Sequence, residues 1–360
     1  MNQPLPLARL LALSLGALQV GCTHMGPKTV AVDRFDYGSA IADSWKQQTL
    51  LNIVKLRYTD LPVFVDVASI VAGYSLETGL TAGGSFPETT SFGGNTATVG
   101  GSAKFTDRPT ITYIPMTGEK FLRGLITPID PKHIFFLLQS GYPADFILGL
   151  TIESLNGVRN SSAATGATRA PDPDFMRALA LLREVQAAGG VGMRVEEGMA
   201  KGQTAVVFFR QEDLPAEIQE KAAEVRRLLK LPGDGDRFTL SYSPVRGAND
   251  QLTVNSRSML QIMSAFAGHV EIPEADLAAG RAMPGITTAA PPGVQSAVRI
   301  RSGPDKPAHA FTAVRYRNTW FWIEDDNWQT KRALTAVMFF FTLAETGGND
   351  RMPLITIPAQ

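Results

Sequence analysis

The segment YSLETGLTAGGSF, residues 74–86, followed after a short connection by TATVGGSAKF, residues 96–105, decides the fold of the N-terminal half. In each run, small or apolar side chains alternate with mostly polar ones, which is the period of a β-strand with one apolar face. The connection at 87–95 contains Pro, Asn and two glycines, as turns do. The two runs therefore predict a long, Gly-rich, amphipathic β-hairpin over residues 74–105.

Two interpretations of this hairpin remain open. Its apolar face can pack on the protein's own core, as one face of an antiparallel sheet commonly does. Alternatively, each copy of the chain contributes a hairpin to a shared membrane barrel, in which strands of roughly 9–11 residues alternate lipid-facing and lumen-facing side chains. In the second interpretation, the candidate interaction or insertion residues are the large apolar ones: Tyr74, Leu76, Leu80, Phe86, Val99 and Phe105.

The first 21 residues have the composition of an export signal. Arg9 supplies a positive charge, Leu10–Val20 is predominantly apolar, and Gly21 places a small residue before Cys22. The apolar run is shorter than the roughly 20 residues that a membrane-spanning helix needs. We therefore predict a signal peptide at residues 1–21.

The signal and Cys22 together resemble the lipobox of bacterial lipoproteins. The family pattern has Leu three residues before the cysteine, where this chain has Gln19. The resemblance implies that residues 1–21 are removed and that Cys22 is acylated. Thr23 follows the cysteine, which in the Gram-negative family implies sorting to the outer membrane.

Cysteine usage and charge exclude several classes of protein. Cys22 is the only cysteine in 360 residues, so an acylated chain has no thiol for a disulfide, a thiolate metal site or a cysteine nucleophile. Lys plus Arg equals Asp plus Glu, at 34 each, and neither sign forms a block. This balance argues against nucleic acid as a partner.

The rest of the chain predicts helices mixed with short strands. Asp36 is a predicted cap for a helix that runs to about Tyr58, and residues 118–155 predict three helices punctuated by prolines. Residues 157–173 contain SSAATGAT and two prolines, as linkers do. We therefore predict a signal peptide at 1–21, a tether at 22–35, an N-terminal helical region at 36–156 with hairpin 74–105, a linker at 157–173 and a C-terminal α+β domain at 174–360.

The C-terminal part predicts antiparallel hairpins covered by helices. Strands at Ala310–Arg317 and Trp320–Glu324 are expected to join at a tight Asn318–Thr319 turn. Asp326 is expected to cap a terminal helix, whose apolar run Ala333–Ala344 predicts burial. The predicted fold class is α+β, with antiparallel sheets and helices.

No motif predicts a catalytic, metal or cofactor site. The four histidines, His24, His133, His269 and His309, do not have the spacing of metal ligands, and hydrolase and nucleotide signatures are missing from the sequence. The densest acid cluster is Glu324, Asp325 and Asp326. Such carboxylates can act as acid and base or bind a hard cation, or they can stabilise the positive end of the following helix. An envelope hydrolase using this cluster is one alternative function.

Four longer motifs resemble a family of uncharacterised Gram-negative bacterial lipoproteins. The resemblance spans nearly the whole mature chain, and it implies an envelope location without supplying a catalytic residue. The motifs are LRYTDLPVF (56–64), SGYPADFIL (140–148) followed by LNGVRN (155–160), NSRSMLQIM (255–263) and RYRNTWFWIEDDNWQTKRAL (315–334).

Together these observations predict a non-enzymatic lipoprotein with a structural or binding role. It is expected at the outer membrane, anchored on the periplasmic side through acylated Cys22. The expected partners are the membrane and either other envelope proteins or further copies of the chain. The main alternative is an oligomeric outer-membrane pore or assembly into which hairpin 74–105 inserts.

Overall fold

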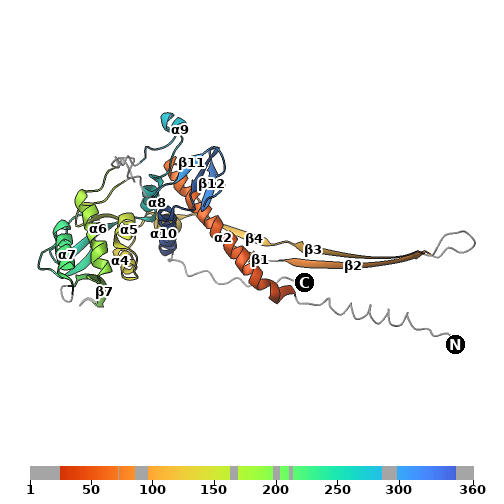
Figure 1. Cartoon of the computed structure of the whole chain (residues 1–360), viewed down its shortest axis with the longest axis horizontal. Coiled ribbons are helices and arrows are strands. Elements are labelled where there is room, and N and C mark those ends of the chain that lie inside the picture. The colour runs from red at the N-terminus through yellow and green to blue at the C-terminus, as the bar shows by residue number, and fades with distance from the viewer. Residues whose placement is uncertain are drawn as a thin grey trace, which may run out of the picture. The chain divides into compact units, whose positions relative to one another are not determined.

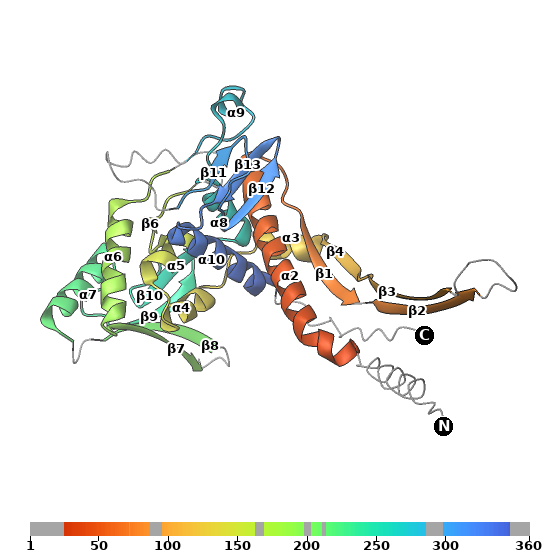
Figure 2. The ribbon, with the colours of Figure 1, turned by 45° about the vertical axis from the view of Figure 1, so that its right-hand side comes forward.

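A computed structural model describes residues 25–71, 73–85, 96–162, 169–197, 203–210, 214–285 and 298–345. Helices are interleaved with antiparallel and mixed sheets, which confirms the predicted α+β class (Figures 1 and 2). The chain divides into two compact units, residues 1–48 and 49–360.

The elements have the following bounds. The helices are α2 (Met25–Arg57), α3 (Glu119–Ile126), α4 (Pro131–Gln139), α5 (Ala144–Thr151), α6 (Pro173–Ala187), α7 (Ala216–Leu228), α8 (Met259–Ala267), α9 (Glu274–Ala278) and α10 (Trp328–Glu345). The strands are β1 (Phe64–Val71), β2 (Tyr74–Ser85), β3 (Thr96–Asp107), β4 (Thr110–Met116), β5 (Ile152–Leu155), β6 (Val158–Arg159), β7 (Val191–Glu197), β8 (Gln203–Phe209), β9 (Arg237–Tyr242), β10 (Gln251–Ser256), β11 (Arg301–Gly303), β12 (Thr312–Tyr316) and β13 (Thr319–Ile323).

Helix α2 begins earlier than the sequence predicts. It starts at Met25, inside the predicted tether at 22–35, and passes Asp36 without interruption. The physical reason is that the only proline of this stretch, Pro27, falls in the first turn, where a missing N–H costs no helical hydrogen bond. The helix ends at Arg57, and Thr59 beyond it has a positive φ of 61°. Of the predicted tether, residues 22–24 lie outside the described residues.

The larger sheet of the second unit has the strand order β6-β5-β10-β9-β8-β7. Strands β9 and β10 are parallel, and the other neighbours are antiparallel. Helix α6 packs on α5, α7 and β7, while α4 packs on β7 and β9 (Figure 2). The core here contains the fully buried side chains of Phe175, Val185 and Val254, and Phe238 at 1% exposure.

The division of the chain differs from the predicted one at residues 157–173. Strand β5, before this segment, pairs with β10, which the sequence assigned to a separate domain. Asn156 and Gly157 have positive φ values of 48° and 80° and join β5 to β6 in a tight turn. The third predicted helix, α5, ends at Thr151, where β5 begins, and not near Leu155 as predicted. Because both predicted halves share one sheet, residues 49–360 form a single compact unit.

The same unit contains a three-stranded antiparallel sheet, β11-β13-β12. Arg317 and Asn318 join β12 to β13 with positive φ values of 46° and 65°, so the turn lies one residue before the predicted one. Phe321 of β13 is fully buried, with its ring centroid 6.2 Å from that of Tyr58. These contacts tie the end of α2 to the C-terminal hairpin.

Helix α10 has the buried face that its apolar run predicts. Phe340 is fully buried, whereas Phe339 beside it is 42% exposed. The residue that caps α10 is Asn327 and not the predicted Asp326. The Asn327 side chain accepts a hydrogen bond from the Thr330 amide at 3.0 Å. Asn327 immediately precedes the first helical residue, and this is the position from which a side-chain oxygen reaches the free amides of the first turn.

Candidate interaction site

Strands β1 and β4 lead into β2 and β3, so that four strands make one long two-stranded antiparallel ribbon. Between the two paired segments, the Arg108 amide donates to the Gly73 carbonyl at 2.9 Å. The predicted hairpin is present as β2 and β3, each of 12 residues. Among the described elements, β2 and β3 form a sheet with each other alone (Figures 1 and 2). We call β2 and β3 together the β2–β3 ribbon.

The register of the β2–β3 ribbon sorts its residues into two sets. On one face, polar and glycine positions pair with each other: Glu77 with Lys104, Gly79 with Ser102, Thr81 with Gly100 and Gly83 with Thr98. On the other, the apolar positions pair: Leu76 with Phe105, Thr78 with Ala103, Leu80 with Gly101 and Ala82 with Val99. The alternation of each strand is therefore in phase with that of its partner, which makes the ribbon amphipathic.

Most of the predicted insertion residues are placed through their backbone only. Four of them lie on the strands at the apolar register positions: Leu76, Leu80, Val99 and Phe105. Tyr74 also lies on its strand, where it pairs with Asp107. Their side chains are outside the described part of the structure. Phe86 lies outside the described residues altogether.

Hydroxyl groups cover the glycines of the polar face. Thr81 donates to the Gly100 carbonyl at 3.1 Å, and Thr98 donates to Gly83 at 3.2 Å. A Cβ atom at Gly79 would lie 2.8 Å from the Ser102 Oγ, and one at Gly100 would lie 3.0 Å from the Thr81 Oγ1. Larger side chains at these glycines would displace the hydroxyls, so this face is both polar and thin.

One ion pair crosses the polar face. The Lys104 Nζ lies 3.9 Å from the Glu77 Oε2, and the two side chains are 70% and 71% exposed. At such exposure the pair contributes little to stability, typically below about 1 kcal/mol. The sequence alone does not pair these two residues, because the strand alternation does not say which residue of β3 opposes which residue of β2. In a hairpin, the turn type and the length of the connection set that register.

The predicted acid cluster does not converge on a common point. Arg301 Nε lies 3.0 Å from the Glu324 Oε1, while Lys331 lies 2.7 Å from Asp325 and its hydrogen bond lowers the pKa of that carboxyl. The Asp326 carbonyl accepts the Trp328 amide. The described residues contain no group of three or more His, Cys, Asp or Glu side chains placed to hold a metal ion. In this arrangement the contacts of the acid cluster hold the segment that leads into α10.

The histidines lie apart. His133 is exposed on α4, and His309 is exposed in the segment before β12. His269 follows α8, where burial and then the nearby Arg57 guanidinium lower its pKa, while a hydrogen bond with the Val298 backbone opposes the shift. His24 lies outside the described residues. The structure thus brings no two of the described histidines into one site.

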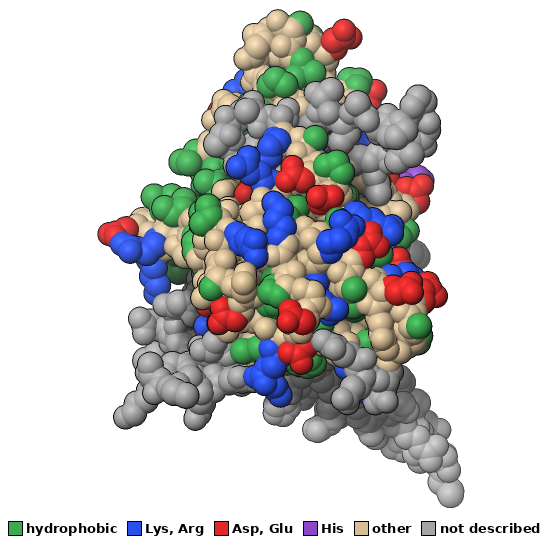
Figure 3. Space-filling view, turned by 90° about the vertical axis from the view of Figure 1, so that its left-hand side faces the viewer, with side chains coloured by type: hydrophobic (Ala, Val, Ile, Leu, Met, Phe, Trp, Pro, Cys, Tyr) green, Lys and Arg blue, Asp and Glu red, His purple; other side chains and the backbone are tan. Residues whose placement is uncertain are grey.

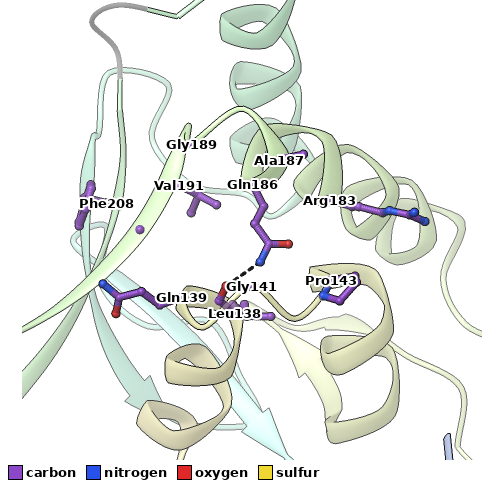
Figure 4. A pocket seen from close by; sticks show the side chains of 11 residues that line it. Leu138, Gln139, Gly141, Pro143, Arg183, Gln186, Ala187, Gly189, Val191 and Phe208 are labelled. Carbon is purple, nitrogen blue, oxygen red and sulfur yellow. Dashed lines mark hydrogen bonds between the residues drawn. The ribbon is translucent and has the colours of Figure 1, made fainter. Parts of the chain in front are cut away.

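A hollow of about 480 Å³ lies between α4, α6 and β7 (Figure 4). Gln186, on its wall, donates to the carbonyls of Leu138 and Tyr142 at 2.7 and 2.8 Å and accepts the Ala144 amide at 2.8 Å. Arg183, also on the wall, pairs with Asp145 at 3.1 Å. Gln186 and Arg183 are thus engaged in joining α4, α5 and α6.

Two of the longer motifs, NSRSMLQIM and LNGVRN, place buried polar side chains on backbone groups. Arg257 is 4% exposed at its side chain; it bonds the carbonyls of Gly149, Leu150 and Ser161 and pairs with Glu153 at 3.2 Å. Asn156, in the β5–β6 turn, and Asn160, directly after β6, act in the same way. Asn156 accepts from Thr253 and donates to the Leu229 carbonyl, and Asn160 donates to the carbonyls of Gly149 and Ile152.

The LRYTD motif forms a similar structural cluster. The Tyr58 hydroxyl donates to Asp276 at 2.6 Å, and the Arg57 guanidinium bonds the Pro284 carbonyl. Burial, followed by the hydrogen bond to Asp276, raises the pKa of Tyr58 above its usual range. Arg317 lies over the Tyr58 ring, 5.0 Å from its centroid, and pairs with Asp60 at 3.4 Å. These contacts join α2 to α9 and to the β12–β13 turn.

The surface has no area of a single charge on the face shown in Figure 3, where Lys and Arg are interspersed with Asp and Glu. On α5, α6 and α7 these residues form ion pairs, including Arg177 with Glu224 and Lys221 with Glu184. Within the described part of the chain, no helix is both long enough and apolar enough to cross a bilayer.

No protein-family model, no curated protein and no solved structure matches this chain.

Proposed function

We propose that this chain is a lipid-anchored envelope protein with a structural or binding role, held at the outer membrane on its periplasmic side through acylated Cys22. The lipobox-like sequence before Cys22 supports the anchor. The β2–β3 ribbon supports the binding role and is the observation that carries it. Its outer edges pair with no other described strand, and the free N–H and C=O groups of an edge can pair with a strand of another chain.

The buried polar residues favour this role over catalysis. Arg257, Asn156 and Asn160 are engaged with backbone carbonyls and amides, and the described carboxylates Glu324 and Asp325 each have a cationic partner. Groups that hold a fold in this way are not poised to transfer protons to a substrate. The proposal therefore includes no catalytic residue, metal or cofactor.

Replacing Cys22 with Ala is expected to release the protein from the membrane. The parent chain should remain in the membrane fraction after a high-salt wash and should carry the mass of the acyl chains, because several buried chains hold far more strongly than one. The Cys22→Ala variant should lack that mass and lose most of its membrane retention. Gln19→Leu is the matched control: it restores the lipobox leucine, so it should keep the anchor and increase the processed fraction. A parent chain that carries no fatty acid and washes off in salt would contradict the anchor.

A second candidate function is an oligomeric outer-membrane pore or assembly into which the β2–β3 ribbon inserts. The length and register of the ribbon favour it. Twelve residues that rise about 3.4 Å each, tilted by about 40°, span roughly 30 Å, which is comparable to the hydrocarbon thickness of a bilayer. Dye release from liposomes tests this candidate, since a chain that leaves liposomes intact at every concentration is not a pore.

A further inference from the structure

The outer edges of the β2–β3 ribbon pair with no other strand in the described part of the chain. In an antiparallel pair, every second residue directs its N–H and C=O away from the neighbouring strand, so about six residues on each 12-residue edge face no other described strand. Edge strands in other proteins are protected by proline, by several lysines or by bulges. Residues 74–85 and 96–107 contain no proline and only one lysine, and their pairing runs without a register shift. An isolated two-stranded hairpin is also marginally stable in water.

We propose that the partner is a second copy of this chain, with β3 of one copy lying antiparallel to β2 of the next. This inference deepens the proposed binding role by naming the partner. The arrangement is head-to-tail, so its repetition closes into a ring when the rotation between copies allows it. Each added copy satisfies one edge of β2 and one edge of β3. Closure satisfies all of them, and only closure removes every edge.

Charge complementarity favours a second copy. Within the stretch 74–106, Glu77 is the only acidic residue of β2 and Lys104 is the only basic residue of β3, and the two occupy opposite positions of the ribbon. When β3 lies beside β2 of the next copy in a similar register, Lys104 faces a second Glu77. Carboxylates and ammonium groups then alternate around the assembly. Both side chains are about 70% exposed, which leaves room for this second partner.

The two faces also match between copies. A β3–β2 contact in this register places the Ser, Thr and Gly positions of all copies on one face and the apolar positions on the other, since the side chains of neighbouring strands share the pleat. The Gly79 and Gly100 positions leave the polar face thin, covered only by hydroxyls. The assembled sheet would therefore present a hydroxyl-lined face to water and an apolar face to lipid or to a protein core.

Charge-reversal variants of the full-length, lipidated chain in detergent test this inference. Native mass spectrometry should show the parent as a discrete multimer. Glu77→Lys alone and Lys104→Glu alone place like charges at every contact, so each should raise the concentration for half-assembly by at least about tenfold. The double variant Glu77→Lys/Lys104→Glu should assemble like the parent. Thr81→Ser keeps the hydroxyl on the same face and is the control, expected to assemble normally.

Mixing the two single variants separates contacts between copies from contacts within one. In a Glu77→Lys chain both positions are basic, and in a Lys104→Glu chain both are acidic, so within each ribbon the charges repel. Between a Glu77→Lys chain and a neighbouring Lys104→Glu chain, the charges attract. A 1:1 mixture should therefore form mixed multimers where neither variant does so alone. A mixture that stays dissociated, or a parent chain that is monomeric in detergent and in liposomes, would overturn the inference.

Failure of this inference is distinguishable from failure of the proposed function. Membrane retention after a high-salt wash depends on Cys22 and not on residues 77 and 104, so it is measured on the same variants. A monomeric chain that is still retained leaves the anchored binding role in place and rejects only the second copy as partner. Thermal unfolding confirms that each variant is folded; β2 and β3 pair only with each other among the described strands, so the core transition should stay unchanged.

Discussion

Replacing Arg257 with methionine is expected to lower the free energy of unfolding by about 3–5 kcal/mol. The guanidinium is nearly fully buried and reaches three backbone carbonyls as well as Glu153. Methionine has a similar length but no donors. The part-buried Leu150 and Ser161 carbonyls would lose this donor, whereas the Gly149 carbonyl would keep Asn160. The Glu153 carboxylate, which is 19% exposed, would keep Arg169 as its one charged partner. An unsatisfied buried acceptor costs about 1–3 kcal/mol, so two of them account for a loss of this size.

Arg169→Met is the matched control for Arg257. Arg169 pairs with the same carboxylate at the same 3.2 Å, but its side chain is 41% exposed. Its removal should therefore cost about 1 kcal/mol or less. Urea unfolding of both variants, followed by the signal of the tryptophans, gives the comparison. Equal losses for Arg257→Met and Arg169→Met would mean that the carbonyl contacts of Arg257 do not hold α5 to β10.

Replacing Phe340 with alanine is expected to cost about 3–5 kcal/mol, because the whole buried ring is lost and a cavity remains. Phe340 is fully buried on the inner face of α10, near the ring of Phe339 at 6.0 Å between centroids. Helix α10 packs on α3 and α8, so a cavity there weakens the contact between helices that are far apart in sequence.

Phe339→Ala provides the control one residue away. The Phe339 ring is 42% exposed, and its truncation removes less buried area and leaves no closed cavity. We expect a loss of about 1 kcal/mol. Thermal unfolding at a fixed protein concentration measures both variants. If Phe339→Ala destabilised the chain as much as Phe340→Ala, the inner face of α10 would be wrongly assigned, or Phe339 would be covered by a partner.

The sequence was sufficient where local periodicity is strong. The alternation of residues 74–86 and 96–105 predicted the strands that the structure places at Tyr74–Ser85 and Thr96–Asp107. The apolar run of α10 predicted its buried face. In these elements the side chains themselves determine the conformation, since each pattern fits only one backbone period.

The structure differs from the sequence predictions mainly where contacts between residues far apart in the sequence decide an element. The Asn156–Gly157 pair is a strong local signal for a hairpin turn, and it was available in the sequence. The helical pattern before it continues to about Leu155, so the sequence predicts a helix up to this pair. Strand β10 (Gln251–Ser256), by contrast, lies where the sequence predicts no strand, and it takes its place through pairing with β5 and β9. The pairing with β5 joins residues about 100 positions apart, and no local pattern specifies it.

By itself, the sequence determined the α+β class, the period of the hairpin and the absence of any thiol beyond Cys22. The tertiary structure alone decided that residues 49–360 form one unit, that Arg257 and Asn156 hold its backbone, and that Glu77 opposes Lys104. The physical reason is that secondary-structure period is a property of neighbours along the chain. Register, burial of a charge and the partner of a carbonyl are set only when segments far apart in sequence meet.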